Sequence, residues 1–514
     1  MSNLAKSAFW LMVVTMLSKV LGFAREIVLG YFYGTSAYSD IYITAMNIPL
    51  VVFAAIGSAL ATTFIPLYHE ALEEGGKKGA LKFSNNIIGI VSILSILLAI
   101  LGYIFAEPLV KLFAMNFTGE KLELTIHFVR IMIIGILFIG LSYIMTSYLQ
   151  IQGDFTIPGM IGFPNNIIII ISIIMSAIMK NIDILAIGGL LAMLSQFLFQ
   201  VPFAIKKGFK FKLSIDFKDK YLRKMLWLVL PVFIGVAVTQ VNTMVDRSLA
   251  SGLGDGVITS LNNANRLNGF VLGLFIATLG AIIYPTLSKL STENNKEKFA
   301  ESVATSVNCV NLVSLPTTIG AIVLATPVVR ILFQRGAFDE RSTALTATAL
   351  VFYSVGMVGV GLRDILGKVF YSLKDTKTPM INGIIAVILN IVLNIALVKV
   401  MGHGGLALAT SLSAIICILL LFGSLKKKIG YYGQDKIKST FLKSLISSLI
   451  MGVVTYFIYK FLSGMLGLGF IQEAISLGVS VAIGAIVYAI LVVALKVEEI
   501  DMLIDMIKKK IGKA

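Results

Sequence analysis

The sequence predicts an all-α polytopic membrane protein of about fourteen transmembrane helices, with two six-helix lobes followed by two further helices. Of its 514 residues, 57% are hydrophobic and only 14% are charged, whereas soluble chains are roughly 25% charged. The mean hydropathy is +0.92. Apolar runs of about 20 residues, the length at which a helix crosses a bilayer, recur along the whole chain. These three observations argue against a soluble fold.

Each apolar run is expected to form one transmembrane helix. The first run is too long for a cleavable signal peptide and carries charged residues in its middle, so we expect it to remain as the first span. The predicted spans are 8–33, 43–65, 86–106, 128–149, 159–179, 184–205, 226–249, 267–288, 304–325, 346–371, 380–400, 405–425, 441–461 and 470–495.

The distribution of Lys and Arg predicts which ends of the spans face the cytoplasm, because short cationic loops stay inside. Connections after even-numbered spans are rich in cations, above all 206–224, whereas the connection 35–40 has none. Both termini are therefore predicted to be cytoplasmic, the second one with a basic tail at 508–513. The formal charge of +16 is then mostly an orientation signal with some attraction to anionic lipid head groups, so we expect no nucleic-acid partner.

The two halves of the chain repeat each other at a shift of 219 residues. Because each repeat holds six spans, both halves enter the membrane from the same side, and we expect a pseudo-two-fold axis along the membrane normal. The matching segments are Pro66 with Pro285, 106–113 with 325–332 and, after a two-residue insertion, 153–158 with 374–379.

The repeat predicts four parts of the chain. Residues 1–205 form the first lobe, 206–225 a basic cytoplasmic linker, 226–425 the second lobe, and 426–514 the last two spans with the basic tail. Two lobes joined by a linker are typical of alternating access, in which a central cavity opens to one face and then to the other.

Charged side chains inside spans are the candidate site residues, because a charge at mid-bilayer costs at least about 2.5–3.5 kcal/mol. One hypothesis is that Arg25 and Arg266, from opposite lobes, converge on an anionic substrate, since guanidinium groups bind phosphate through two parallel donors. The alternative is that Arg25 pairs with Glu26 or Asp40 as a structural bridge. The candidates are Lys19, Arg25, Glu26, Asp40, Arg266 and Arg363.

A second candidate is a cation site in the second lobe. Asp246 lies deep in the seventh span, Asn390 and Asn394 lie four residues apart on one helix face, and Thr410 lies in the twelfth span. Oxygen ligands of this kind hold a Na⁺ or relay a proton. The alternative is that Asp246 neutralises its neighbour Arg247 and that the Asn side chains bond helix to helix.

Motifs for other chemistry are weak. No Gly-rich loop is followed by Lys and Ser or Thr, so ATP hydrolysis by this chain is disfavoured. The three His residues are scattered, and both Cys residues lie inside apolar runs, so neither a disulfide framework nor a Cys-based metal site is supported. We expect a protein that is not an enzyme and has no cofactor beyond a coupling ion.

Several stretches resemble the MurJ (MviN) family of lipid II flippases, within the multidrug/oligosaccharidyl-lipid/polysaccharide (MOP) exporter superfamily. The likeness covers essentially the whole chain. The most specific stretches are SKVLGFARE at 18–26 with Gly34 and Asp40, TFIPLY at 63–68, NTMVDRSLAS at 242–251, ANRL at 264–267, LFQRGAF at 332–338 and DTKTP at 375–379.

The resemblance implies export of the undecaprenyl-pyrophosphate-linked cell-wall precursor, lipid II, across a bacterial plasma membrane. It implies that Lys19, Arg25 and Arg266 meet the pyrophosphate, with Asp40 as acidic partner, and that the last two spans line a groove for the lipid tail. The cation-site residues resemble a family sodium site, so Na⁺ or H⁺ and the membrane potential are the expected drivers. We expect a monomer that contacts other cell-wall proteins transiently.

The chain departs from the family pattern in the second span. Many members carry an Arg pair and a Glu-Gly-Ala stretch there, whereas this chain reads LVVFAAIGSA at 50–59. That departure removes one expected cationic contact. It leaves open a flippase for another polyprenyl-linked oligosaccharide.

Rival functions predict other residues. A drug/cation antiporter of the same superfamily needs a compact cavity with carboxylates and aromatic rings, and the pair Arg25 and Arg266 argues against it. A polyprenyl-phosphate glycosyltransferase needs an outer catalytic loop with paired acids, and the loop 107–127 is too short for one. A scaffold for wall enzymes gives no reason for cations inside spans.

Overall fold

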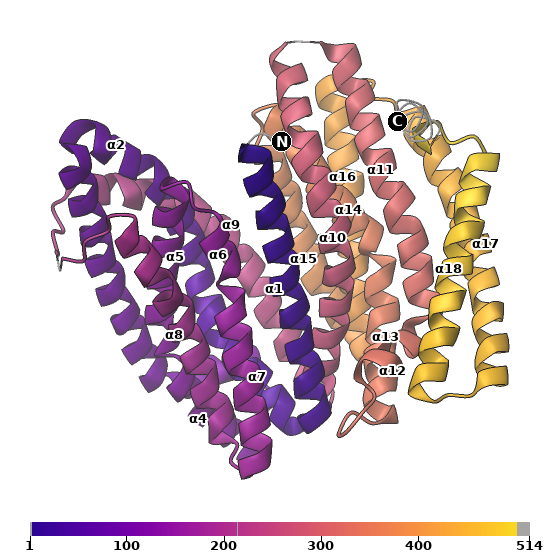
Figure 1. Ribbon diagram of the computed structural model, residues 1–514, viewed down its shortest axis with the longest axis horizontal. Coiled ribbons are helices and arrows are strands. Elements are labelled where there is room, and N and C mark those ends of the chain that lie inside the picture. The colour runs from indigo at the N-terminus through magenta and orange to yellow at the C-terminus, as the bar shows by residue number, and fades with distance from the viewer. Residues whose placement is uncertain (1–2, 213, 294, 501–514) are drawn as a thin grey trace. The chain divides into compact units, whose positions relative to one another are not determined.

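The computed structural model describes residues 3–212, 214–293 and 295–500, and this part of the chain is helical without strands. The basic tail predicted at 508–513 lies outside the described residues. Figure 1 shows the helices in chain order. They are α1 (Asn3–Tyr33), α2 (Ala37–Ile104), α3 (Ala106–Phe113), α4 (Gly119–Met132), α5 (Gly135–Ile151), α6 (Thr156–Met160), α7 (Gly162–Met179), α8 (Asp183–Lys206), α9 (Lys220–Ala250), α10 (Val257–Thr292), α11 (Lys296–Val323), α12 (Ala325–Phe333), α13 (Glu340–Val355), α14 (Met357–Ser372), α15 (Lys377–Met401), α16 (His403–Ile429), α17 (Gln434–Leu466) and α18 (Phe470–Ala494).

The predicted fold class is confirmed, and each predicted span lies on helical segments, although 128–149, 159–179 and 346–371 are each divided between two helices. Within the described residues, eight helices are long and apolar enough to cross a membrane, or ten when two bent pairs are each counted as one span. The bent pairs are α4 with α5, at 42°, and α13 with α14, at 44°. The very long α2 contains both the second and the third predicted spans.

The apolar part of the second span is predicted to end at Pro66, but the helix that carries it does not end there. Helical backbone continues through Pro66 into the polar connection, is broken by a kink at Gly76, where φ is 60°, and resumes as far as Ile104. The connection is rich in Glu and Lys, which are strong helix formers. A polar composition therefore ends the apolar span there without ending the helix.

The internal repeat recurs in the local structure. The short helices α3 and α12 occupy matching positions, and a bent pair follows each of them. Gly153 and Lys374 both have positive φ, 76° and 58°. One residue later, Asp154 accepts from the Ile157 N–H at 3.2 Å and Asp375 from the Thr378 N–H at 2.9 Å. The same Asp-capped turn thus closes the corresponding spans of both halves.

Two compact units divide the chain, Met1–Thr259 with Arg335–Phe338, and Ser260–Gln334 with Asp339–Ala514. In the first unit, α2 packs against α4, α5 and α9. Asn85 on α2 binds the connection between α8 and α9: its Nδ2 donates to the Lys210 carbonyl at 2.8 Å, and its Oδ1 accepts from the Lys212 N–H at 2.8 Å. Helix α9 packs in this unit, and the lobe boundaries drawn from the repeat stay a prediction.

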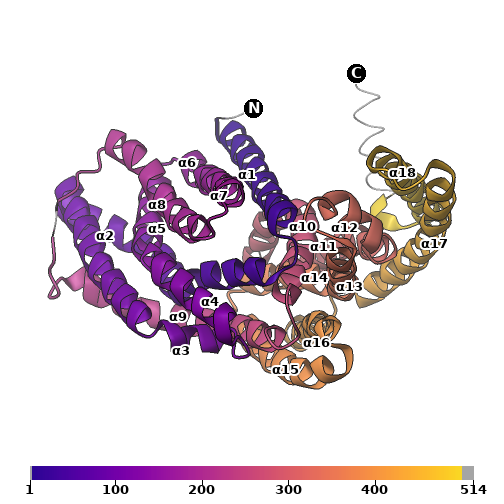
Figure 2. The ribbon, with the colours of Figure 1, turned by 90° about the horizontal axis from the view of Figure 1, so that it is seen from below.

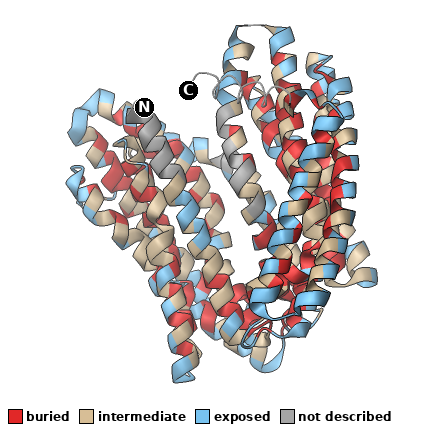
Figure 3. Cartoon of the chain, turned by 45° about the vertical axis from the view of Figure 1, so that its right-hand side comes forward, coloured by how far each residue is buried: buried red, intermediate tan, exposed pale blue. Residues whose placement is uncertain are grey.

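In the second unit, α11 packs against α14 and α17, α15 pairs with α16, and α17 pairs with α18. Figure 2 shows the pairs α15–α16 and α17–α18 each lying side by side. Apolar side chains remain exposed in the middle of helices, among them Ile388 and Val392 on α15. Figure 3 shows exposed residues along the full length of the helices. Apolar exposure at mid-helix fits a surface that faces lipid.

Candidate functional site

Arg25 is buried inside the first unit, on α1. Its Nη2 donates to Glu26 Oε1 at 2.6 Å, and its Nη1 donates to Asn166 Oδ1 on α7 at 3.1 Å. Only 8% of Arg25 and 3% of Glu26 are exposed. Gly22 on α1 lies against the Asn166 side chain, and a Cβ there would be in ordinary contact with Asn166 Nδ2 at 3.4 Å. The pairing of Arg25 with Glu26 is the one that the structural alternative predicts, and a role of Arg25 toward a ligand stays a prediction.

The burial of this pair predicts a large stability effect for Glu26→Gln. The substitution keeps the side-chain shape but leaves the Arg25 charge buried without a counter-charge, which costs about 3–5 kcal/mol. We expect that loss in the free energy of unfolding of the detergent-purified protein, measured by titration with a denaturing detergent. The control is Glu107→Gln, which breaks the exposed Glu107–Lys111 pair and should cost about 1 kcal/mol or less. Equal losses for both variants would contradict the prediction.

Asp40 lies in the first turn of α2 and is fully buried. Its Oδ2 accepts from the Gly256 N–H at 2.8 Å, and its Oδ1 accepts from the Thr259 N–H at 2.9 Å. The Thr259 hydroxyl lies 2.8 Å from Oδ1 as well. These donors belong to the start of α10, where a negative charge is favoured by the helix dipole and by unpaired N–H groups. Asp40 therefore fastens the start of α10 to the start of α2.

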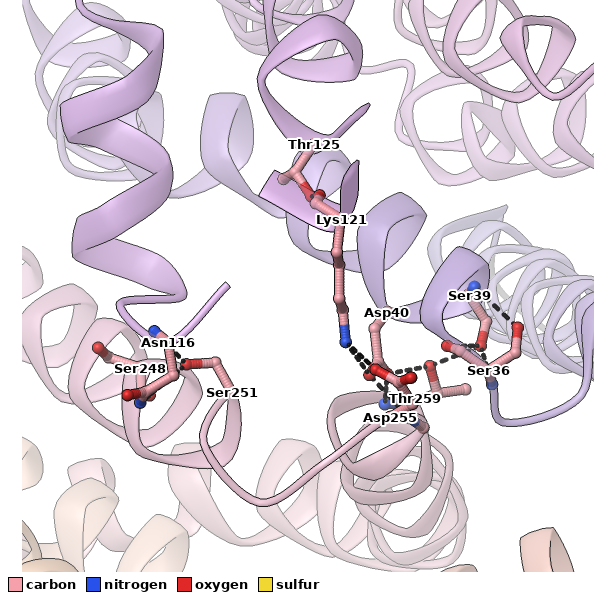
Figure 4. A network of polar contacts seen from close by, with 11 residues as sticks. Ser36, Ser39, Asp40, Asn116, Lys121, Thr125, Ser248, Ser251, Asp255 and Thr259 are labelled. Carbon is pink, nitrogen blue, oxygen red and sulfur yellow. Dashed lines mark hydrogen bonds and ion pairs between the residues drawn. The ribbon is translucent and has the colours of Figure 1, made fainter. Parts of the chain in front are cut away.

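Lys121 completes this network, as Figure 4 shows. Its Nζ lies 3.2 Å from Asp40 Oδ2 and 2.7 Å from Asp255 Oδ1. The same Nζ lies 4.1 Å from the centre of the Phe117 ring. Asp40 is the acidic partner expected for the cations that bind the substrate. Its carboxylate contacts Lys121 and backbone N–H groups rather than Arg25.

Glycines let backbone segments touch around Asp40. A Cβ on Gly256 would lie 2.2 Å from the Thr35 carbonyl oxygen, and one on Gly34 would lie 2.3 Å from the Ala337 carbonyl oxygen. Both glycines have positive φ, 84° and 57°. The Ala337 N–H donates to the Tyr31 carbonyl at 2.8 Å. We call the cluster of Gly34, Asp40, Lys121, Gly256 and Thr259 the latch.

The latch joins segments that lie far apart in the sequence. Residues 34–40 follow the first span of the first repeat, whereas 255–259 and 335–338 come from connections in the second. Beside it, Asn116 meets Ser251, whose Oγ accepts from the Asn116 N–H at 3.2 Å. By the distribution of cations, all of these connections are predicted to lie on the outer side. All of these residues belong to the first unit, in which the latch holds the start of α10 and the segment 335–338 against residues 31–40.

The remaining predicted cations are exposed. Lys19 lies on α1 in the first unit, whereas Arg266 on α10 and Arg363 on α14 lie in the second unit. Convergence of Arg25 and Arg266 stays a prediction.

Three residues of the predicted cation site lie together in the second unit. Asn394 Nδ2 donates to Asn390 Oδ1 at 2.9 Å, and Asn390 Nδ2 donates to the Thr410 hydroxyl at 3.4 Å. Asp246 belongs to the first unit, where the Asn242 amide donates to its carboxylate at 3.4 Å. The described residues contain no group of three or more His, Cys, Asp or Glu side chains that could hold a metal ion. An amide-rich site would suit a monovalent cation rather than a transition metal.

An apolar groove of about 570 Å³ runs between the helices α11, α13, α14, α16 and α17 of the second unit. Lys438 and Gln434 line it where α17 begins, Asn311 and Thr318 are its polar members on α11, and most of the remaining wall is hydrophobic. Its apolar wall includes Leu315 and Ile319 of α11, Val358 and Leu362 of α14, Ile415 and Ile418 of α16, and Ile437 and Phe441 of α17.

The residues alone predict neither the apolar groove nor the contacts of the latch. The family resemblance implies a groove at the last two spans, and of these two only α17 lines the groove described above. Asp40 is a predicted site residue, but its partners at the start of α10 are not predicted. The signal that could have indicated the latch is the coincidence of glycines at 34, 256 and 336 with loops on one predicted side. In the second span, the missing cationic stretch is replaced by close packing: a Cβ on Gly57 would lie 2.5 Å from the ring of Tyr143.

Comparisons with known proteins agree along the whole chain. A family model described as Lipid II flippase MurJ matches residues 29–477. The probable lipid II flippase MurJ of Vibrio cholerae is 28% identical over 512 residues, covering 97% of this chain and 98% of that protein. Lipid II flippase MurJ of Burkholderia cenocepacia is 26% identical over 443 residues, covering 84% of this chain and 85% of that protein.

Solved structures give the same result. Lipid II flippase MurJ in an inward closed conformation matches with a TM-score of 0.80 and 28% identity, covering 94% of this chain and 99% of that one. An inward-facing multidrug resistance MATE family transporter of the MOP superfamily matches with a TM-score of 0.68. At 16% identity, over 83% of this chain and 99% of that one, the second match shows a shared fold.

The repeated helical halves, the charges inside helices and the apolar groove define a multi-pass membrane transport protein. The family model and the full-length relatives then identify the family. The chain belongs to the MurJ family of lipid II flippases, as the motifs from 18–26 to 375–379 predict.

Proposed function

We propose that this chain is a non-enzymatic flippase that moves lipid II from the inner to the outer leaflet by alternating access. The observation that carries the proposal is the groove of about 570 Å³, apolar in its depth and cationic at one end, within a chain of the MurJ family. A groove with this polarity suits an isoprenoid tail that begins at an anionic head group.

The physics of the substrate assigns different parts of the chain to its two ends. A diphosphate with a sugar head loses its hydration in hydrocarbon, which is prohibitively costly without replacement partners. Arg25, Arg266 and Lys19 supply the replacement donors in the proposed cavity. The tail stays in lipid and in the groove, where its burial contributes about 25 cal/mol per Å².

The proposed cycle uses the membrane potential. An inside-negative potential contributes about 2.3 kcal/mol per charge per 100 mV and favours outward movement of an anion. Na⁺ or H⁺ would accompany the return, with Asp246, Asn390, Asn394 and Thr410 as the proposed ligands. We place the protein in the bacterial plasma membrane as a monomer, with both termini cytoplasmic and with transient contacts to other cell-wall proteins.

The test replaces Arg25 or Arg266 with Ala in cells depleted of their own flippase and measures lipid II at the outer leaflet. We expect both variants to lose export at least tenfold. Arg266 is exposed, and Arg25→Lys keeps the buried charge beside Glu26. Lys399→Ala, a cation on a connection predicted to be outer, is the control and should export normally. Retained export by both Ala variants would refute the proposed anion site.

A further inference from the structure

A second pocket, of about 440 Å³, lies in the second unit where α11, α12 and α13 meet. It is separate from the apolar groove: of their lining residues the two share only Ile322. Its wall is mixed, and its polar members are Thr326, Arg330, Gln334, Glu340, Thr343 and Thr348. The chemistry of this wall differs from that of a tail-binding groove, so the pocket requires a different occupant.

Arg330 is held in place by a buried carboxylate. Its Nη1 donates to Glu473 Oε1 of α18 at 2.9 Å, and the Tyr459 hydroxyl of α17 donates to the same oxygen at 2.8 Å. The Glu473 side chain is 3% exposed, whereas that of Arg330 is 30% exposed and lines the pocket. A guanidinium has five N–H donors. Glu473 thus fixes the orientation of Arg330, and donors remain to offer to an occupant.

The polarity of the pocket changes along the helix axis. Glu340 opens α13, and Val351 lies eleven residues further along the same wall, which is about 16 Å at 1.5 Å per residue. The Thr343 hydroxyl donates to Gln334 Oε1 at 3.0 Å in the first turns of α13, near Glu340, whereas Ala347, Thr348 and Val351 lie further along the helix. Such a gradient across the edge of a membrane matches an amphiphile with a polar head and an apolar chain.

The charges of the pocket specify the head group. Glu473 neutralises Arg330 from behind, and Glu340 contributes a second carboxylate on the pocket wall. The site is therefore net negative although it contains a fixed arginine, so an anionic head group is disfavoured. A head group with a phosphate for Arg330 and an ammonium for Glu340 satisfies both residues.

We propose that this pocket binds a zwitterionic phospholipid, with its phosphate at Arg330, its ammonium at Glu340 and the start of an acyl chain toward Val351. The distribution of cations assigns this end of α13 to the outer side, so the lipid belongs to the outer leaflet. The inference is independent of which polyprenyl-linked substrate the chain exports.

The test measures lipid adducts on the detergent-purified full chain by native mass spectrometry. The probes are dioleoyl phosphatidylethanolamine, dioleoyl phosphatidylglycerol and dioleoylglycerol, which share acyl chains and differ in the head. We expect the wild type to retain phosphatidylethanolamine at least threefold better than either other lipid. Glu340→Gln should bring the ratio of phosphatidylethanolamine to phosphatidylglycerol to about one. Ala344→Trp, which fills the pocket, should lower phosphatidylethanolamine binding at least threefold.

These two positions are chosen because both are exposed, whereas Arg330→Gln would leave Glu473 buried without its partner. Glu107→Gln is the matched control, since Glu107 is also an exposed carboxylate on a short helix, and it should keep the wild-type preference. The apolar groove is intact in every variant, so lipid held there does not change between them. Equal binding of dioleoylglycerol by the wild type, or unchanged binding in both Glu340→Gln and Ala344→Trp, would overturn the proposal.

Discussion

Replacing Asp40 with Ala should release the start of α10 and abolish the latch. The carboxylate accepts two backbone N–H groups at 2.8 and 2.9 Å and is fully buried. Each buried donor left without an acceptor costs about 1–3 kcal/mol, so the latched conformation should lose at least about 2 kcal/mol. Because 1.4 kcal/mol is a factor of ten in an equilibrium, the latched population should fall more than tenfold relative to open ones.

The measurement uses a cysteine in place of Thr35, which is buried beneath Gly256. In a background with Cys309 and Cys417 replaced by Ser, we expect Asp40→Ala to raise the rate of labelling by a membrane-impermeant maleimide at least tenfold. Lipid II export should fall as well, because the segments 34–40 and 255–259 lose the fixed arrangement that Asp40 gives them.

Two controls separate the latch from a general loss of an aspartate. Asp183→Ala removes an Asp from the first turn of α8 that is half exposed and pairs with His127, and it should leave labelling at position 35 unchanged. Asp40→Asn keeps one acceptor oxygen and should give an intermediate rate. If Asp40→Ala is labelled as slowly as the parent, Asp40 does not keep the latch closed over position 35.

The sequence predicts the membrane helices well because the bilayer imposes a simple rule on each span separately. A run of about 20 apolar residues is required wherever a helix crosses hydrocarbon, so 470–495 can be assigned without knowing its neighbours. The repeat adds the turns at Asp154 and Asp375, which depend on residues only three apart.

The sequence pattern does not predict contacts between segments that lie far apart in the chain. Asp40 and Thr259 are 219 residues apart, and Arg25 and Asn166 are 141 apart. Helical periodicity does not indicate which neighbour a polar side chain contacts. Asp40 is therefore predicted only as a partner of the cations that bind the substrate, and its contacts with Lys121 and with the start of α10 are not predicted. The groove is not predicted either, since its wall combines residues of α11, α13, α14, α16 and α17 that lie far apart in the sequence.

Filling the groove should impair export in proportion to the length of the lipid tail. Ile415 of α16 is half buried and lines the groove, so Ile415→Trp places an indole ring where the proposed tail packs. Loss of about 60 Å² of tail burial costs roughly 1.5 kcal/mol at 25 cal/mol per Å², which is about a tenfold loss of affinity. Reconstituted vesicles should therefore export undecaprenyl lipid II about tenfold more slowly, whereas an analogue with a short prenyl tail should move at the wild-type rate. Val392→Trp, on the exposed face of α15, adds the same ring outside the groove and should export both. If Ile415→Trp slows the two substrates equally, the ring disturbs the fold and the groove is not the tail site; if it slows neither, the tail lies elsewhere.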